Sequence, residues 1–229
     1  MIGNPGDPAI MNTGFFSSGY RFFKFTSGYI CDYTPDKRYE TSEGAIKQLG
    51  LHSQLASFSL ILVKRLQIYG TAGGTKETVK EQPIYDMIFD SHMNYHFSYS
   101  LGAKVILLQW GQTFLSTDIG YFDVPESHKS FFKYLNRLNL PLVSEKKQRL
   151  HLDEWQASVG LSSRFIFFTP YVGGVYLHSR LHADITYANK DKWGYFYGVT
   201  LSLTGRLHVN FERRQHDESS YTLSTNAVF

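Results

Sequence analysis

The hydrophobic residues of this chain recur at every second position along most of its length. In the segment "KWGYFYGVTLSL", Gly194, Gly198, Thr200 and Ser202 separate large apolar or aromatic residues, namely Trp193, Tyr195, Tyr197, Val199, Leu201 and Leu203. Since successive side chains of a β-strand point to opposite faces, this spacing predicts a strand with one apolar face and one polar or small face.

The same alternation predicts ten strands. Their expected ranges are Tyr20–Tyr33, Gln54–Val63, Arg65–Gly73, Tyr95–Leu107, Gln112–Asp123, Trp155–Leu161, Tyr171–Ile185, Trp193–Leu203, Arg206–Phe211 and Tyr221–Phe229. Short links are expected near residues 63–65, 109–112, 165–170 and 203–206, and they alternate with long polar links at 34–51, 75–91, 124–149, 188–192 and 215–219. Short turns that alternate with long loops are typical of outer-membrane barrels.

Charged residues occupy the polar face of several of these strands, which a soluble core would not accept. A membrane barrel accepts them because lipid contacts one face of its wall while a polar lumen contacts the other. Aromatic residues near strand ends, such as Trp155, Tyr171, Trp193 and Tyr221, are expected to form the interfacial girdles. We therefore predict an all-β protein: one closed antiparallel transmembrane β-barrel of about ten strands over residues 1–229, with short periplasmic turns and long extracellular loops. A soluble β-sandwich or lipocalin-like fold is the alternative.

The face opposite the apolar one should line the lumen. In the strand after Pro170, the apolar face is expected to comprise Tyr171, Val175, Leu177, Leu181 and Ile185. The intervening residues, together with their equivalents in other strands, supply the predicted lumen-lining set: Lys24, His96, Lys104, Asp118, Glu154, Arg164, His178, Arg180, His182, Asp184, Arg206 and His208. Cations outnumber anions in this set, which predicts a weak preference for anions.

Composition narrows the function classes. The net charge is only +3 and the basic residues are scattered, so no nucleic-acid partner is expected. Cys31 is the single cysteine, which excludes an intramolecular disulfide and a cysteine-based zinc cluster. His178, His182 and Asp184 share one strand face, but Arg180 between them would repel a cation, so neither a metal nor another cofactor is expected.

Catalytic motifs are weak. The segment "GTAGGTK" has Thr75 where a phosphate-binding loop needs glycine before its lysine, and neither Gly-x-Ser-x-Gly nor His-Glu-x-x-His occurs. We therefore expect that the chain is not an enzyme. A hydrolase would need Ser, His and Asp side chains brought together by the fold.

Several segments resemble the chlamydial major outer membrane protein porins. These are "EWQAS" from Glu154, "FTPYVGGVY" from Phe168 and "HADI" from His182, with "IGNPGDPA" near the start, "FSYSLGAKVILLQWG" from Phe97 and, more weakly, "LQIYGTAGGT" from Leu66. The resemblance implies a surface-exposed general porin made with a cleaved leader. The chain is shorter than the usual members of that family and lacks their many cysteines.

The expected function is a porin-type barrel of the bacterial outer membrane, crossing it many times, which lets small hydrophilic solutes or ions diffuse passively and contributes to the cell envelope. A non-conducting structural or adhesive surface barrel is the alternative. A ten-stranded barrel is closer in size to barrels filled by side chains than to those with a water-filled channel. The expected partners are outer-membrane lipid and small solutes or ions, and formation of a homo-oligomer stays open.

Overall fold

The structure is a computed structural model that describes residues 23–40, 46–62, 65–81, 87–92, 95–129, 132–135, 140–143, 148–182, 186–189, 191–204, 206–216 and 219–229. All regular elements in these ranges are β-strands. No helix in the described part of the chain is long and apolar enough to cross a membrane.

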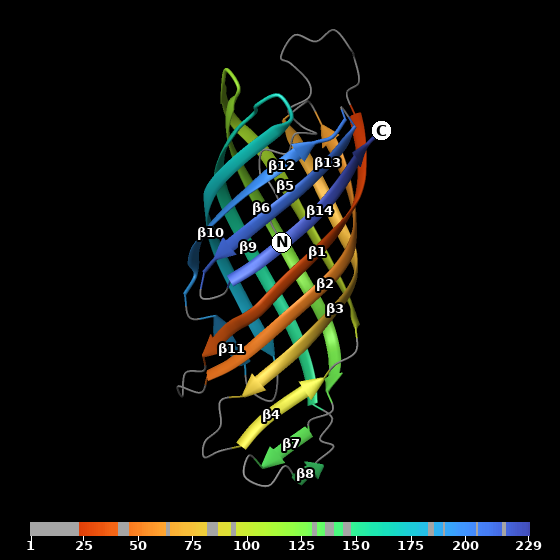
Figure 1. Ribbon diagram of the computed structural model, residues 1–229, viewed down its shortest axis with the longest axis vertical. Coiled ribbons are helices and arrows are strands. Elements are labelled where there is room, and N and C mark those ends of the chain that lie inside the picture. The colour runs from red at the N-terminus through yellow and green to blue at the C-terminus, as the bar shows by residue number, and fades with distance from the viewer. Residues whose placement is uncertain are drawn as a thin grey trace.

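Ten strands pair antiparallel in a ring, and the pairing of the first with the last closes it (Figure 1). This confirms the predicted closed barrel of ten strands. In ring order the strands are β1 (Phe23–Glu40), β2 (Ile46–Leu62), β3 (Leu66–Glu81), β5 (His96–Trp110), β6 (Thr113–Lys129), β9 (Gln148–Ser163), β10 (Phe168–His182), β12 (Trp193–Ser202), β13 (Leu207–Gln215) and β14 (Ser219–Val228).

Four short strands lie outside this ring. Strands β4 (Met87–His92), β7 (Phe132–Leu135) and β8 (Leu140–Val143) pair in succession from the end of β3 and extend the sheet beyond the barrel, at the bottom of Figure 1. Strand β11 (Thr186–Asn189) pairs with both β10 and β1. None of these four strands was predicted.

The barrel wall is tall on one side and low on the other. Strands β1 to β3, β5, β6, β9 and β10 have 15 to 18 residues, whereas β12, β13 and β14 have 10, 9 and 10. About 9 to 11 residues of a tilted strand cross a bilayer. The long strands therefore continue beyond the membrane on the side away from the tight turns, and parts of the predicted long links, such as residues 35–40 and 46–50, are strand.

The hairpin between β5 and β6 shows how a tight turn forms. Trp110 pairs with Thr113 across a two-residue loop of Gly111 and Gln112. Gly111 has a φ of 61°, a left-handed conformation that glycine adopts without steric cost. A positive φ at the first loop residue is shared by type I′ and type II′ turns, whose twist matches the twist of the two strands.

The outer wall carries the apolar band that lipid requires. Phe58, Leu101, Ile119, Val159 and Phe211 are exposed on the outside at the middle of their strands. Exposed aromatic residues lie near both ends of the band, with Phe23, Trp110 and Phe167 beside the tight turns and Tyr33, Tyr95, Trp155, Trp193 and Tyr195 about ten residues along the strands. Trp155 and Trp193 thus lie where girdle residues were predicted. Tyr171 was wrongly expected there, because its side chain is 4% exposed and faces the interior.

Candidate functional site

The barrel interior contains a layer of polar and charged side chains. On one side, the Tyr69 hydroxyl of β3 donates a hydrogen bond of 3.0 Å to Asp118 Oδ1 of β6. Lys104 of β5 pairs with Asp118 in the strand register, and its Nζ lies 5.4 Å from the centre of the Tyr69 ring. Asp118 is fully buried, and the positive charge and the hydroxyl offset part of the hydration that its carboxylate has lost.

A second network lies on the opposite wall. The Tyr171 hydroxyl of β10 lies 2.9 Å from both Asn210 Oδ1 and Glu212 Oε2 of β13. Arg214, two residues further along β13, reaches past β14 to Asp32 of β1, with Nη2 2.8 Å from Asp32 Oδ1. Thr222 on the intervening β14 contacts both Arg214 and Asp32. Three strands are thus tied together by side chains inside the wall.

One ion pair crosses the full width of the barrel. Lys37 Nζ of β1 contacts Glu154 Oε2 of β9, and the two side chains are 3% and 7% exposed. Strands β1 and β9 are five strands apart in the ring whichever way one counts. A direct contact between these side chains therefore spans the lumen at this level.

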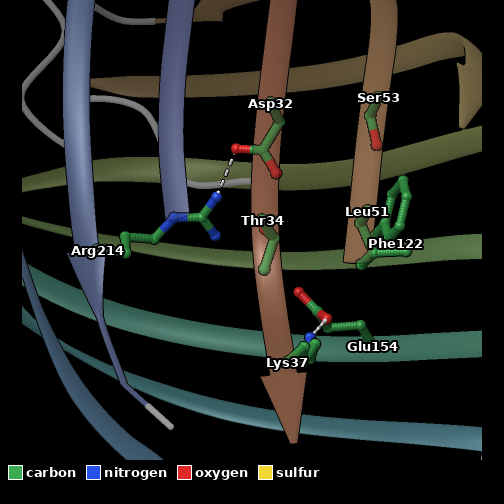
Figure 2. Close-up of a pocket in the computed structure, with 8 residues that line it drawn as sticks. All are labelled: Asp32, Thr34, Lys37, Leu51, Ser53, Phe122, Glu154 and Arg214. Atoms are coloured by element: carbon green, nitrogen blue, oxygen red, sulfur yellow. Dashed lines mark hydrogen bonds and ion pairs between the residues drawn. The ribbon is translucent and has the colours of Figure 1, made fainter. Parts of the chain in front are cut away.

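A small cavity lies between this pair and Arg214 (Figure 2). Its lining residues are Asp32, Thr34, Lys37, Leu51, Ser53, Phe122, Glu154 and Arg214. The cavity has a volume of about 20 Å³, and a cavity needs about 10 to 15 Å³ to hold one water molecule. The cavity therefore has room for one or two waters between two ion pairs.

Apolar side chains fill the interior above and below the charged layer. On the extracellular side the Tyr39 cluster draws on six strands and comprises Tyr39, Leu49, Leu51, Leu55, Phe122, Val124, Leu150, Leu152, Leu181 and Tyr187. On the side of the tight turns, Ile61, Ile106 and Phe114 pack together with Val228. Apolar constrictions of this kind hold water poorly and can block conduction by dewetting.

Strand β11 narrows the barrel at the level of the Tyr39 cluster. It pairs with β10 from Arg180 to His182 and with β1 at Tyr39 and Glu40, so one short strand replaces the three strands β12 to β14 there. The Tyr39 hydroxyl also contacts the Ser179 hydroxyl of β10 at 2.8 Å. Bringing β1 and β10 together in this way allows the apolar side chains to meet across the interior.

The predicted lumen residues do not all lie in the barrel interior. Lys104, Asp118, Glu154 and His208 are buried on the inner side of the wall. Lys24 and His96 are partly buried. They lie two residues from the buried Thr26 and Ser98, on the same inward-facing side of their strands. Arg164 and Arg206 lie in the tight turns after β9 and β12 rather than in the wall. Asp184 lies outside the described residues.

His178, Arg180 and His182 are on the outer face, so their assignment to the lumen was wrong. Their inward neighbours on β10 are Leu177, Ser179 and Leu181, which are at most 3% exposed. Arg180 is exposed, and its Nε donates a hydrogen bond of 3.0 Å to His178 Nε2. His182 Nε2 lies 2.8 Å from Asp153 Oδ1 on the outside of β9.

The polarity of the two faces of the wall changes with height. Beyond the membrane the outside of the wall meets water instead of lipid, so the polar face turns outward and the apolar face inward. Strand β9 shows the change along its length. Trp155 and Val159 are exposed on the outside, while Leu150 and Leu152, in the opposite phase, are buried inside. On β10 the predicted apolar face is inward along its whole length, because Tyr171 and Val175 near the tight turn also lie inside, packed with Phe196. Val172 is exposed on the outside there, so both faces of this strand carry apolar residues and the alternation did not distinguish them.

Five charged interior residues were missed: Asp32, Lys37, Glu77, Glu212 and Arg214. Glu212 and Arg214 continue the inward phase of His208 and Asn210, so following that alternation beyond Phe211 would have found them. Lys37 has the inward phase only because the register shifts between Thr34 and Lys37. A two-residue period cannot reveal such a bulge.

The interior charges do not favour anions as predicted. Among the described residues that face inward, five are acidic and four are basic: Asp32, Glu77, Asp118, Glu154 and Glu212 against Lys24, Lys37, Lys104 and Arg214. The cationic excess of the prediction came from Arg164, Arg206 and the outward residues of β10.

No protein-family model matches the sequence, and no curated protein matches it. Among solved structures, the chain is similar to the outer membrane protease OmpT from Escherichia coli, with 13% identity, 90% of this chain and 95% of that chain covered, and a TM-score of 0.48. The translocator domain of the autotransporter NalP from Neisseria meningitidis has 8% identity, coverages of 93% and 90%, and a TM-score of 0.48. An outer membrane channel from Pseudomonas putida F1 has 12% identity, coverages of 95% and 99%, and a TM-score of 0.46.

These similar structures include a protease as well as a channel. This finding corrects the prediction from the sequence that the chain is not an enzyme, because such barrels occur in both classes. The architecture itself rests on the strand pairing described above.

Proposed function

We propose that the chain is an outer-membrane barrel with a restricted channel, which passes water and small ions and excludes solutes the size of sugars. The observation that carries the proposal is the charged layer around the cavity of Figure 2, held between two apolar layers. The charged side chains and one or two waters beside them can replace part of the hydration shell of an ion inside the barrel. The resemblance of the Glu154–Asp184 block to porins supports a channel role.

The Lys37–Glu154 pair is the obstacle that an ion meets in this layer. Its carboxylate and ammonium groups satisfy each other across the lumen, so an ion can pass only when they separate or rearrange. Separating two buried charges is costly, which makes passage infrequent. The Tyr39 cluster adds an apolar barrier beside them.

A second candidate is a sealed surface barrel, and the Tyr39 cluster is the observation that favours it. Ten buried residues from six strands close the interior at the level where β11 narrows the wall. Such a barrel would act through its outer surface and its extracellular extension of β4, β7 and β8. It would conduct no ions.

Transport into proteoliposomes tests the proposal and separates the two candidates. Vesicles that contain the folded chain should dissipate a potassium chloride gradient faster than empty vesicles, yet should not swell in an isosmotic arabinose solution. Swelling in arabinose would contradict the restricted channel and support a wide porin. Ion flux no faster than in empty vesicles would support the sealed barrel.

A further inference from the structure

A cluster of histidine and aspartate side chains lies on the outer wall above the membrane. His182 Nε2 of β10 lies 2.8 Å from Asp153 Oδ1 of β9. In the same way, His151 Nε2 of β9 lies 2.6 Å from Asp123 Oδ1 of β6. The centres of the two imidazole rings are 5.5 Å apart. Two histidine–aspartate pairs therefore lie side by side on three neighbouring strands.

Strand β11 brings a hydroxyl group to this cluster. Thr186, the first residue of β11, is the register partner of His182, so the two side chains lie next to each other on the outer face. Thr186 is exposed, and its Oγ1 lies 3.3 Å from His182 Nδ1. The inward residues of β11, Tyr187 and Asn189, are buried. His182 therefore contacts a hydroxyl group through one ring nitrogen and a carboxylate through the other.

These two contacts determine which nitrogen of His182 carries the proton. A carboxylate can only accept a hydrogen bond, so the contact with Asp153 places the proton of a neutral imidazole on Nε2. Nδ1 then has the free lone pair and accepts the hydrogen bond that the Thr186 hydroxyl donates. A hydroxyl, an imidazole and a carboxylate joined in this order form the arrangement that activates serine and threonine nucleophiles.

The exposure of the side chains suits these roles. The aspartate side chains of the two pairs are 8% and 15% exposed, whereas the histidine side chains are 41% and 40% exposed. The carboxylates are thus shielded from water, which strengthens their hydrogen bonds to the imidazoles. The imidazoles are open to a substrate from the surrounding solution. Arg180 is exposed on the same face and pairs with Asp153 in the strand register, so it adds a positive charge beside the site.

The position along the strands places the site in water. Trp155 of the outer aromatic girdle pairs with His178, and His151 pairs with His182 four residues further along both strands. At a rise of about 3.4 Å per residue and a tilt of about 45°, the second pair lies about 10 Å beyond the girdle. A substrate therefore reaches the site from the aqueous side rather than from the acyl chains of the bilayer.

From this geometry we propose that the outer wall carries an esterase site, in which Thr186 is the nucleophile, His182 is the general base and Asp153 is a positioning residue. Its substrate class is a carboxylic ester of a water-soluble molecule. The site goes beyond the channel proposed above and does not depend on conduction, because all of its side chains lie outside the barrel.

The reaction proceeds through an acyl-threonine. Thr186 Oγ1 attacks the carbonyl carbon of the ester while its proton passes to His182 Nδ1. Arg180 and a protonated His151 supply positive charge to the oxyanion that forms. The bond to the leaving oxygen then breaks, and the alcohol departs with the proton from His182. A water molecule, deprotonated by His182, attacks the acyl carbon; the threonine oxygen leaves and recovers its proton, which releases the carboxylic acid.

Acetyl transfer from p-nitrophenyl acetate to the full chain in detergent micelles tests the site. The folded wild type should release a burst of about one p-nitrophenolate per chain, and peptide mass spectrometry should find the acetyl group on Thr186. Thr186→Ser should keep this reaction, and Thr186→Val, which keeps the branched shape, should lose the burst. His182→Gln should slow the acetylation by roughly 100-fold or more, the usual contribution of a general base.

Asp153→Asn separates positioning from a structural role. The amide can still contact His182, so the variant should keep the shift of the folded band on an unheated gel. Because an amide no longer fixes the proton on Nε2, the rate of acetylation at saturating ester should fall, though by less than in His182→Gln. The KM for the ester should stay the same.

His52→Gln is the matched control, because His52 is another imidazole on the outer face. It contacts the Tyr95 hydroxyl at 2.8 Å and Cys31 Sγ at 3.7 Å. Its replacement should leave the acetylation of Thr186 unchanged. No acetyl group on Thr186 of the folded wild type, an unchanged rate in His182→Gln, or an equal loss in His52→Gln would overturn the proposal. Release of fatty acid from phospholipid vesicles faster than release of p-nitrophenolate would overturn the assignment of a water-soluble substrate.

Discussion

At the scale of single residues, the direction in which a position faces, into the barrel or away from it, decides which side chains the position tolerates. Gly173 and Gly174 are consecutive on β10 but face opposite ways. A Cβ on Gly173 would lie 2.3 Å from the Val159 carbonyl oxygen and 2.4 Å from the Phe196 ring, whereas a Cβ on Gly174 would meet only the Gly194 carbonyl oxygen, at 3.9 Å. The two positions therefore differ in tolerance although they look alike in the sequence.

Gly173→Ala should destabilise the barrel by about 1 to 3 kcal/mol, the usual cost of overpacking a close-packed interior, and Gly174→Ala should change its stability little. Urea-induced unfolding in lipid vesicles, followed by tryptophan fluorescence, measures both. An equal effect of the two substitutions would show that the inside and outside of β10 have been assigned wrongly.

The sequence predicts such phases well only where lipid defines the outside. Trp155, Val159 and Phe211 lie outside as the alternation predicted, because the membrane makes the outer face apolar. Leu177 and Leu181 were expected on the same face and lie inside, and so do Tyr171 and Val175 of the membrane part of β10, where both faces of the strand carry apolar residues. The position of the membrane along a strand is a property of the whole barrel, and an alternating pattern does not contain it.

At the scale of elements, the junction between the end of β11 and the start of β12 depends on the side chain of Asn189. Pairing of β10 with β12 runs to Tyr176, and pairing with β11 starts at Arg180, which leaves backbone groups between them without a strand partner. Asn189 fills the gap: its Oδ1 accepts from the Ser179 amide at 3.0 Å, and its Nδ2 donates to the Leu177 carbonyl at 2.9 Å. This side chain holds β11 in register against β10.

Asn189→Ala should loosen β11 while the ten-stranded ring stays intact, because a buried amide and carbonyl would lose their partners at roughly 1 to 3 kcal/mol. Hydrogen exchange monitored by mass spectrometry should become faster in peptides that contain residues 177–181 and 186–189. Peptides from β13 and β14 serve as the internal control. Unchanged exchange at residues 177–181 would mean that Asn189 does not support the junction.

Strand β11 could not have been predicted from periodicity. It has four residues, Thr186 to Asn189, and four positions are too few to show alternation. The ten long strands were predictable because each repeats its pattern many times. The tight turns were predictable as well, because each one separates two alternating segments that lie only a few residues apart in the sequence.

At the scale of the whole molecule, the ring has a membrane part of ten strands and a part above it that β11 narrows. The charged layer runs from the Tyr69, Lys104 and Asp118 group in the membrane part to the Lys37–Glu154 pair, which borders the apolar layer of the Tyr39 cluster at the narrowed part. Neither layer was predictable from the sequence, because the Lys37–Glu154 contact joins residues 117 positions apart and on opposite walls. The number of strands and the closure of the ring determine which side chains meet.

The restricted channel is tested most sharply by the ionic current across a planar lipid bilayer, measured for the wild type and for Tyr39→Ala combined with Leu181→Ala. Both residues are fully buried in the Tyr39 cluster, so replacing them opens the apolar barrier without removing a charge. Phe211→Ala, which shortens an exposed side chain of the outer wall, is the control. We expect small, infrequent currents for the wild type and the control, and clearly larger currents for the double variant. Equal currents from all three folded proteins would show that the Tyr39 cluster does not restrict the channel.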